Sequence, residues 1–383
     1  MVSDLFPPPV FEDDILRDLR RRVREFLAHE LANGGFTPAV DSWMSAWDPE
    51  FTRKLAQQGW LGMTIPAEYG GHGATYLERF VVTEELLAAG APVTAHWFAD
   101  RQVAPSLLKF GSQEQKQTLL PRIVDGSVLF AIGMSEPDSG SDLASVRTKA
   151  TRADGGWSLT GSKVWTSNAH KTDYAIALVR TSPFDQEHRH AGMSQLIIDL
   201  HTAGVEIRRI NSLNGEHHFN EVHLDGAFVP DSMVLGTVGD GWKQVTSELG
   251  FERSGPERFL STQRILEELV LTMRVDGLEV DAEIGRFFAR LMGLHQMSIS
   301  VAGALARDEP AEVAAGVVKN LGTVTEGDLT EYAAKLLDSD DTSAVAALRA
   351  ATERSLLLRP GYTLRGGTNE ILRGVIARGL GVR

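Results

Sequence analysis

The strongest constraint on the fold is the order in which helical and strand-like patterns follow one another along the 383 residues. Apolar residues recur at every third or fourth position in Asp13–Leu31, Asp48–Gln58 and Tyr76–Ala89, which is typical of amphipathic helices. Glycine-rich breakers, such as residues 65–73, separate these segments. Residues 1–126 are therefore predicted to form an α-helical domain.

The pattern then changes to short runs rich in β-branched and aromatic residues. Such runs occur at Trp157–Thr160, Tyr174–Val179 and Ser194–Ile198, with turns such as residues 154–156 between them. Their length and composition are typical of strands in a small sheet. Residues 127–232 are predicted to form a central β domain.

Helical spacing returns after Pro230 and continues to the end of the chain. Four segments carry it: Trp242–Leu249, Leu260–Met273, Glu283–Leu305 and Thr325–Leu337. Because helices and strands are segregated along the chain, we expect an α+β fold, and no Gly-x-Gly-x-x-Gly motif follows a strand to suggest a doubly wound sheet. Residues 233–383 are predicted to form a third, helical domain.

The composition excludes several classes of function. Lysine and arginine number 38 against 51 acidic residues, and this net charge of −13 disfavours a nucleic-acid partner. The chain has no cysteine, so thiolate nucleophiles and iron–sulfur clusters are excluded, and redox chemistry would need an organic cofactor. No apolar run approaches the roughly 20 residues that span a bilayer, and the acidic start is unlike a signal peptide, so we expect a cytoplasmic location.

Two segments rich in glycine and hydroxyl groups could hold a flat, polar ligand. The glycines of Gly133–Asp142 permit close backbone approach and its hydroxyls can form hydrogen bonds, although an ordinary surface turn has the same composition. Gly161–His170 places a tryptophan beside hydroxyl groups at the end of a strand, which suits a heteroaromatic ligand. The alternative is a tryptophan that belongs to the core.

A third segment, Glu248–Arg258, combines carboxylates and arginines with a glycine–proline break. Such a break should kink a helix, and kinks of this kind often border a cavity. The alternative is that these charges form solvated pairs three or four residues apart.

The histidines lie mainly in polar, turn-rich segments, as at His188, His190, His217 and His218. The chain has neither cysteine nor a His-Glu-x-x-His pattern beside them. They are predicted to be surface residues rather than metal ligands, and we expect no metal.

Four motifs, in order along the chain, resemble those of the acyl-CoA dehydrogenase family. Pro66–Gly73 resembles the family's Pro-x-x-Tyr-Gly-Gly-x-Gly, and Gly133–Asp142 resembles its Ser/Thr-Glu-Pro-x-x-Gly-Ser-Asp signature. Lys163–Asn168 is similar to the Lys-x-Trp-x-Thr/Ser-Asn strand, and Gly366–Ile371 is similar to Glu-Gly-Thr-x-Glu-Ile. The resemblance covers essentially the whole chain. It implies a helical N-terminal domain, a small central β-barrel or sheet domain and a C-terminal four-helix bundle, with FAD and the acyl chain between the last two.

The resemblance also assigns roles to individual residues. Ser135 should bond the pyrimidine edge of the flavin, Trp165 should pack against the isoalloxazine, and Ser167 should hydrogen-bond near flavin N5. The cofactor-binding positions that the motifs imply are Met134, Ser135, Trp165, Ser167, Gly367, Thr368 and Glu370. The implied substrate-binding positions are Ser141, which should lie along the pantetheine arm, Arg253 and Gly366.

The catalytic base is the first departure from the family pattern. Many members place a glutamate where this chain has Gly366, whose backbone N–H can still donate to the thioester carbonyl. A minority branch keeps its base in a Glu-Arg pair on a helix of the bundle, and Glu252-Arg253 resembles that pair. Glu252 is therefore the candidate base for the α-proton, with Glu248 or another residue as the alternative.

The second departure concerns oligomer formation. The family's Arg-x-x-Phe-Gly segment, which reaches the FAD pyrophosphate across a dimer, is missing, and the shorter, more acidic Met273–Asp281 takes its place. Arg264 or Arg274 would have to substitute. These losses resemble actinobacterial members that work as α2β2 heterotetramers on steroid or other bulky CoA thioesters. We therefore expect either a second acyl-CoA dehydrogenase-like subunit or a homo-oligomer.

The reaction implied by the resemblance is α,β-dehydrogenation of an acyl-CoA thioester to a trans-2-enoyl-CoA, with electrons passing from FAD to an electron-transfer flavoprotein. Gly250 and Gly255, on either side of Glu252, would leave room for a bulky acyl group. Two alternatives stay open. Gly366 and the missing arginine favour a non-catalytic partner subunit, and a flavin oxidase or monooxygenase on the same fold is the other.

Overall fold

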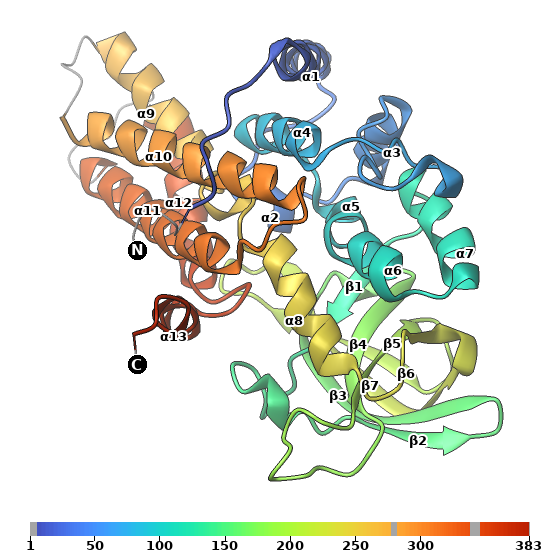
Figure 1. Ribbon diagram of the computed structural model, residues 1–383. Helices are drawn as coiled ribbons and strands as arrows, with labels where there is room; N and C mark the ends of the chain where they lie inside the picture. Colours follow the sequence, from blue (N-terminus) through green and yellow to red (C-terminus); the bar gives the residue numbers. More distant parts are fainter. Residues whose placement is uncertain (1–5, 277–281, 338–344, 383) are drawn as a thin grey trace. The chain divides into compact units, whose positions relative to one another are not determined.

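The computed structural model describes residues 6–276, 282–337 and 345–382, and leaves the side chains of 248–252 and 273–276 undescribed. The chain forms two compact units (Figure 1). The helical unit comprises Met1–Phe51, Ala74–Thr94 and Glu252–Arg383, and the sheet unit comprises Thr52–Gly73 and Ala95–Phe251.

The sheet unit is built on one mixed, eight-stranded sheet with the order β6-β7-β3-β2-β4-β5-β8, and β1 pairs with β4. Its strands are β1 Phe130–Gly133, β2 Lys149–Ala153, β3 Gly156–Ser167, β4 Tyr174–Arg180, β5 Met193–Asp199, β6 Val205–Asn211, β7 His217–Pro230 and β8 Val234–Leu235. The β1–β4 and β2–β4 pairs are parallel, and the other pairs are antiparallel. The short β2–β3 turn contains Gly155, whose φ of +71° is the left-handed conformation that glycine adopts without strain.

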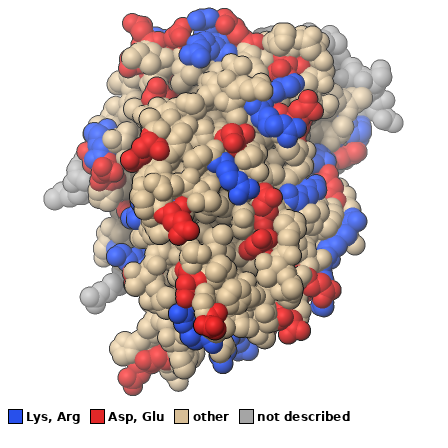
Figure 2. Space-filling view, turned by 90° about the vertical axis from the view of Figure 1, so that its right-hand side faces the viewer, with Lys and Arg blue, Asp and Glu red and all other residues tan. Residues whose placement is uncertain are grey.

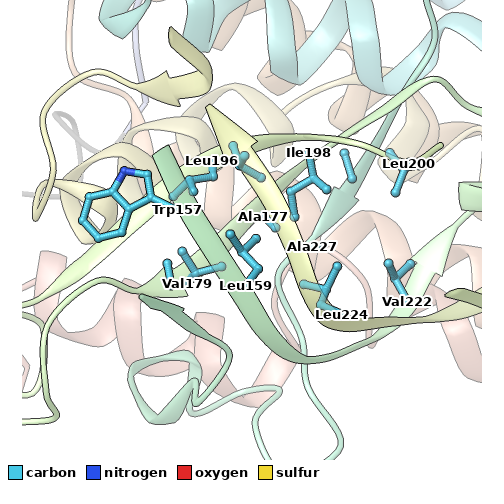
Figure 3. Close-up of a cluster of buried hydrophobic side chains, with 14 of the residues drawn as sticks. Trp157, Leu159, Ala177, Val179, Leu196, Ile198, Leu200, Val222, Leu224 and Ala227 are labelled. Atoms are coloured by element: carbon cyan, nitrogen blue, oxygen red, sulfur yellow. The ribbon is translucent and has the colours of Figure 1, made fainter. Parts of the chain in front are cut away.

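Both faces of the sheet's centre are buried, because alternate residues of a strand point to opposite sides. On one face Leu159, Ala177 and Leu196 pack together in the cluster of Figure 3. On the other face Ile176 and Ile197 pack in a second cluster with side chains of nearby helices. Burial of both faces explains why β4 and β5 consist mostly of consecutive apolar residues.

The helices of the sheet unit lie before and after the strands. They are α6 Ala104–Phe110, α7 Gln113–Val124 and most of α3 Pro49–Gln57, α5 Thr94–Phe98 and α8 Gly241–Glu252. Helix α7 begins with a capping box, in which the Ser112 hydroxyl accepts from the Gln115 N–H and the Gln115 side chain accepts from the Ser112 N–H.

The helical unit joins N-terminal helices to a C-terminal bundle. Its helices are α1 Asp14–Ala32, α2 Ser42–Ser45, α4 Tyr76–Ala88, α9 Gln263–Asp276, α10 Ala282–Leu305, α11 Glu312–Leu337, α12 Ala346–Tyr362 and α13 Asn369–Gly379. In Figure 1, α10, α11 and α12 lie side by side. Leu269 of α9, Phe287 of α10, Leu329 of α11 and Leu348 of α12 share one buried cluster, which forms the core of a four-helix bundle.

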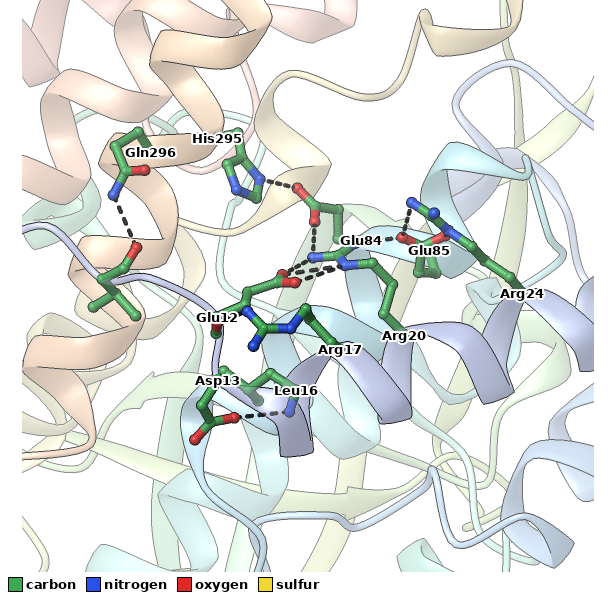
Figure 4. A network of polar contacts seen from close by, with 11 residues as sticks. Glu12, Asp13, Leu16, Arg17, Arg20, Arg24, Glu84, Glu85, His295 and Gln296 are labelled. Atoms are coloured by element: carbon green, nitrogen blue, oxygen red, sulfur yellow. Dashed lines mark hydrogen bonds and ion pairs between the residues drawn. The ribbon is translucent and has the colours of Figure 1, made fainter.

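A buried ion network ties the N-terminal helices to this bundle (Figure 4). Arg20 of α1 pairs with Glu12, with Glu85 and, at 2.8 Å, with Glu84. Glu84 in turn contacts the Nδ1 atom of His295 in α10 at 2.5 Å, and this hydrogen bond raises the pKa of His295. Because removing one partner leaves a buried charge uncompensated, such a network holds α1, α4 and α10 in one arrangement.

The predicted architecture of helices, a central sheet and C-terminal helices is confirmed. The boundaries at residues 126/127 and 232/233 stay predictions, because both compact units are assembled from segments that are not contiguous in sequence. None of the described helices is long and apolar enough to cross a membrane. Figure 2 shows lysines and arginines interspersed with aspartates and glutamates over the face in view.

Candidate active site

The loop that carries the signature motif is fastened by a buried ion pair in the sheet unit. The Lys163 ammonium, on β3, lies 2.7 Å from an Oε1 atom of Glu136 in the loop and donates to the Leu178 carbonyl at 2.5 Å. The Glu136 carboxylate also accepts from the backbone N–H groups of Arg147 at 2.6 Å and Thr148 at 2.9 Å. Burial lowers the pKa of Lys163 to about 8, and the Glu136 carboxylate opposes that lowering. The pair is therefore ionised at neutral pH and fixes the loop against the sheet.

Two further contacts bring the predicted flavin residues together. Lys163 donates to the Met134 carbonyl at 3.3 Å, and the Val164 N–H donates to the Ser135 carbonyl at 2.9 Å. Because Trp165 follows Val164 directly, Met134 and Ser135 lie beside the start of the Trp165–Ser167 segment.

Trp165 stands on a β-bulge. Between Lys163 and Thr166, β3 advances three residues while its partner β7 advances two, from Val222 to Asn220. Trp165, inside this bulge, has φ of +60°, a strained conformation for a large side chain. It is 56% exposed and meets Phe219 edge-on at 5.6 Å. The alternative that this tryptophan belongs to the core is wrong, because the bulge turns the indole out of the sheet.

Residues after Trp165 have buried polar atoms that form no hydrogen bond within the described part of the chain. Thr166 Oγ1 and Asn168 Nδ2 are buried and have no hydrogen-bond partner there. Ser167, between them, is also buried. An unpaired buried polar atom is costly, so such atoms beside an exposed aromatic face fit a flat ligand with polar edges, as a flavin is.

The rest of the signature loop is a tight turn toward solvent. The backbone groups of Glu136 and Ser139 exchange hydrogen bonds of 2.8 and 3.0 Å, and Ser141 beyond them is exposed. Arg180, which is buried, donates to the carbonyls of Ala144 at 2.6 Å and Val146 at 3.2 Å, and so fixes the backbone that follows. Ser141 is therefore accessible to a ligand but is not placed against Trp165 by a direct contact.

In the helical unit, the C-terminal motif forms the turn between α12 and α13. Gly366 and Gly367 both have positive φ, +70° and +86°, which only glycine adopts readily. Thr368 is the N-cap of α13, and its hydroxyl accepts from the Ile371 N–H at 3.3 Å. Glu370 lies exposed in the first turn of α13, where a carboxylate is favoured by the helix dipole.

Buried cations surround this turn. Arg253 donates from Nε to the Gly366 carbonyl at 3.3 Å, and Lys319 donates to the Gly367 carbonyl at 2.8 Å. Arg365 pairs with Asp41 at 2.6 and 2.8 Å. Arg253 is 8% exposed and Arg258 is fully buried, so the alternative of solvated charge pairs is wrong for these arginines. These arginines can be buried because backbone carbonyls and aromatic rings around them take the place of hydrating water.

Position 366 packs closely against Arg258, which would have to shift to admit the glutamate that many family members carry. A Cβ atom built at Gly366 would lie 2.8 Å from an Nη atom of Arg258 and 3.1 Å from its Cζ. The guanidinium of Arg258 also stacks over Trp43, with 5.1 Å to the ring centroid. Arg258 therefore occupies the space that a side chain at 366 would need, and the base has to come from elsewhere.

The candidate base falls at the end of a helix. Glu252 is the last residue of α8. The side chains of Glu252 and Glu248 lie outside the described part of the structure. The same holds for the side chain of Arg274 and for residues 277–281. Arg264, proposed as the alternative phosphate ligand, pairs with Glu267 at 3.5 Å and with Glu268 on its own helix.

The histidine prediction is correct in part. His188 and His190 are exposed, whereas His217 and His218 are half-buried at the start of β7. His217 stacks on His170, with ring centroids 3.7 Å apart, and contacts Asn220 Oδ1 at 2.7 Å. His217 and His218 are therefore only partly exposed, because they lie in a paired strand. Among the described residues, no group of three or more histidine or acidic side chains could hold a metal ion.

Two residues of this turn and its surroundings were missed by the sequence interpretation, Lys319 and Arg365, and Arg258 was noted only as part of the segment Glu248–Arg258. The available signals were the largely apolar helix around Lys319 and the position of Arg365 directly before Gly366. Charged residues are usually exposed, so the pattern alone did not indicate burial.

Fold and site together define a class: a flavin-dependent dehydrogenase with a central sheet and a C-terminal helical bundle. The chain belongs to the acyl-CoA dehydrogenase family. The family patterns "Acyl-CoA dehydrogenase, N-terminal domain" and "Acyl-CoA dehydrogenase, middle domain" match residues 13–127 and 131–227. The family, the class of enzyme and the class of cofactor, FAD, are thereby confirmed.

Several relatives are similar over nearly the whole chain. FadE34 of Mycobacterium tuberculosis is 36% identical over 375 residues, which cover 94% of this chain but 50% of FadE34. IpdE1 of the same organism is 32% identical over 94% of this chain and 96% of IpdE1. The chain thus spans about half of the first relative and nearly all of the second.

Two solved structures are also similar. The Tcur3481-Tcur3483 steroid ACAD matches with a TM-score of 0.84 and 30% identity, covering 97% of this chain and 99% of the other. The ChsE4-ChsE5 complex from Mycobacterium tuberculosis matches with a TM-score of 0.81 and 27% identity, covering 98% of this chain and 99% of the other.

Proposed function

We propose that this chain is the catalytic subunit of an acyl-CoA dehydrogenase that oxidises the α and β carbons of a bulky CoA thioester. The observation that carries the proposal is the arrangement in the sheet unit, where the signature loop, the exposed Trp165 and unused polar atoms at Thr166 and Asn168 adjoin one another. A subunit without a catalytic role would not need an exposed tryptophan on a strained bulge. Ser135, Trp165 and Ser167 are the residues that we expect to hold the flavin, with Met134 beside them.

In this proposal Glu252 removes the α-proton of the thioester. Backbone N–H groups of the Gly366–Thr368 turn donate hydrogen bonds to the thioester oxygen as the α C–H bond breaks. Bound FAD supplies the acceptor for the hydride that leaves the β carbon. Thr368 and Glu370, at the start of α13, belong to the same turn, and Arg253 fixes it through the Gly366 carbonyl.

A bulky, steroid-like acyl group is supported by the relatives. The Tcur3481-Tcur3483 structure is named as a steroid ACAD. Gly366, with Arg258 beside it, also departs from the common family pattern at the position of the base. Ser141, exposed on the signature loop, is the residue we expect along the CoA arm.

A second acyl-CoA dehydrogenase-like subunit is the partner we propose. Both of the similar structures named above pair two different chains, as their names state. FadE34 carries a further half of its length outside the match with this chain, enough for a second copy of such a fold. The electron-transfer flavoprotein as acceptor and a cytoplasmic location complete the proposal, by analogy with the family.

The experiment is a substitution of the candidate base. The purified enzyme, with its partner subunit, is assayed against CoA thioesters with short straight, branched and steroid-derived acyl groups, as wild type, Glu252→Gln and Glu248→Gln. We expect Glu252→Gln to lower kcat by roughly 10²–10⁴-fold, the usual contribution of a positioned base, and Glu248→Gln to stay near wild type. A fully active Glu252→Gln enzyme would refute Glu252, and better turnover of short straight chains would refute the bulky substrate.

The second candidate function is a non-catalytic partner subunit. Gly366 favours it, because the position that usually carries the base is both empty and blocked by Arg258. The same assay separates the two proposals. If neither Glu252→Gln nor Glu248→Gln lowers turnover in the assembled enzyme, the result favours activity in the other subunit.

A further inference from the structure

We propose that Lys319 is a positioning residue for the dehydrogenation: its buried ammonium holds the α12–α13 turn so that backbone N–H groups of the turn face the thioester carbonyl. The inference deepens the proposed function and rests on it. Lys319 touches neither reacting carbon in this scheme, since it acts through the turn alone.

The contacts of Lys319 span the whole turn. Lys319 is fully buried in the first half of α11, and its Nζ atom donates to the Thr363 carbonyl at 3.0 Å, to the Gly367 carbonyl at 2.8 Å and to Asn369 Oδ1 at 2.7 Å. An ammonium has three N–H bonds, so these three acceptors match its donors. The hydroxyl of Thr323, one turn further along α11, supports the same amide at 3.2–3.3 Å.

The anchored carbonyls fix the direction of the neighbouring N–H groups. All peptide bonds of the described chain are trans, and in a planar trans peptide the C=O and N–H point in opposite directions. The Gly367 carbonyl points at Lys319, so the Thr368 N–H points away from it. The Gly366 carbonyl is held by Arg253, so the Gly367 N–H is turned away from that arginine in the same manner.

Both N–H groups are available to a ligand. Neither the Gly367 nor the Thr368 N–H donates to an acceptor in the described part of the chain. They precede α13, an 11-residue helix whose dipole adds positive potential at this end.

This geometry suits the charge that develops in the reaction. When the α C–H bond breaks and the proton goes to the base, the electron pair is shared with the thioester oxygen. Donors that are already oriented stabilise that oxygen without further reorganisation. If Lys319 were apolar, the carbonyls of Thr363 and Gly367 would lose their buried donor, and fewer contacts would hold the orientation of the turn.

The test isolates α-proton removal. The assembled enzyme is incubated in D2O with the 3-thia analogue of its best thioester substrate, which has sulfur at the β position and cannot lose a β-hydride. Deuterium uptake at the α carbon is followed by mass spectrometry. We expect Lys319→Met to exchange roughly 10–100-fold more slowly than wild type, and to lower kcat with the normal substrate more than it raises KM.

Thr330→Val is the matched control. Thr330 lies on the same helix, is fully buried and bonds to Ser355 Oγ at 2.8 Å and to the Glu326 carbonyl at 2.9 Å, but it touches no atom of the turn. A comparable loss of thermal stability with a wild-type exchange rate is expected for it. Equal slowing in both variants would mean that the Lys319 effect is merely structural, and would overturn the proposal.

The remaining outcomes are also decisive. A Lys319→Met enzyme with wild-type exchange overturns the positioning role while leaving the proposed function intact. If wild type neither exchanges nor dehydrogenates any thioester, the proposed function fails instead. Should Lys319→Met not fold, Thr323→Val replaces it: a several-fold slower exchange supports the proposal, and an unchanged rate overturns it.

Discussion

Two loops in this molecule are each held by a buried lysine, and they are held differently. In the sheet unit, Lys163 meets a carboxylate, Glu136, that belongs to the loop it fastens. In the helical unit, the three described acceptors of Lys319 are neutral oxygens of the turn. The signature loop thus offers its lysine a carboxylate, whereas the described hydrogen bonds of Lys319 to the C-terminal turn are to carbonyl and amide oxygens. We infer that the first is a self-contained clamp and the second is coupled to the bundle.

The charges near the second loop support this difference. Asp41 pairs with Arg365, and Glu326 accepts from the Ser261 N–H at 2.8 Å. Burial raises the pKa of Glu326 to about 7, although the Arg365 charge opposes the rise. The helical unit therefore contains a buried carboxyl group with a pKa of about 7 next to Arg365, whereas burial lowers the pKa of the clamp's Lys163 to about 8 in the sheet unit.

The largest effect should come from breaking the clamp. Lys163→Met leaves the Glu136 carboxylate buried and unneutralised, so we expect a loss of about 3–5 kcal/mol in the free energy of unfolding. Urea denaturation measures it. The double variant Lys163→Met/Glu136→Gln, which removes the charge but keeps an acceptor, should regain part of this loss. If the double variant is no more stable than the single one, the clamp is not a charge pair in energetic terms.

The next effect is a pH dependence of the helical unit. Because Glu326 has a pKa of about 7 in the folded state and near 4.5 when unfolded, the folded chain holds this proton more tightly. Stability should therefore decrease as pH rises from about 4.5 to 7, by about 3 kcal/mol at roughly 1.4 kcal/mol per pKa unit. Glu326→Gln should flatten that decline in urea unfolding at pH 5 and pH 7.5. The same slope in variant and wild type would contradict the assignment.

A smaller effect is expected at the blocked position. Gly366→Glu must displace Arg258 and adopt φ near +70°, so we expect a destabilisation of about 1–3 kcal/mol. In a Glu252→Gln background it should not restore dehydrogenation. Gly285→Glu is the control, because a Cβ at that helical position meets no atom within 4 Å. Recovered activity in the double variant would show that Arg258 moves aside easily.

The smallest effect concerns charge pairs on the surface. Glu206 and Arg208 form a 2.8 Å pair on β6, and both are exposed to solvent. Water screens such a pair, so Glu206→Gln should leave the thermal unfolding midpoint unchanged within error. A clear shift would show that exposed ion pairs stabilise this fold as buried ones do. The buried pair of the signature loop would then not be special in its contribution to stability.

The sequence predicted most of the elements and the loops that carry the motifs. Helices such as Asp14–Ala32 follow from apolar spacing alone, because one face must be buried, and their predicted existence is confirmed. The roles of the site residues stay predictions. Lys319 could not be placed, since its burial depends on carbonyls 44 and 48 positions away in the chain. The outward orientation of the Trp165 side chain could not be predicted from the sequence either, because it depends on a single extra residue in β3.

The most direct test of the account is the FAD content and native mass of the purified chain, alone and co-expressed with a second acyl-CoA dehydrogenase-like subunit. We predict that the chain alone is poor in FAD, because the segment that usually supplies an arginine to the pyrophosphate is missing from its sequence. With the partner it should bind about one FAD per unlike pair. One FAD per chain in a homo-oligomer of this protein alone would contradict the heteromeric enzyme.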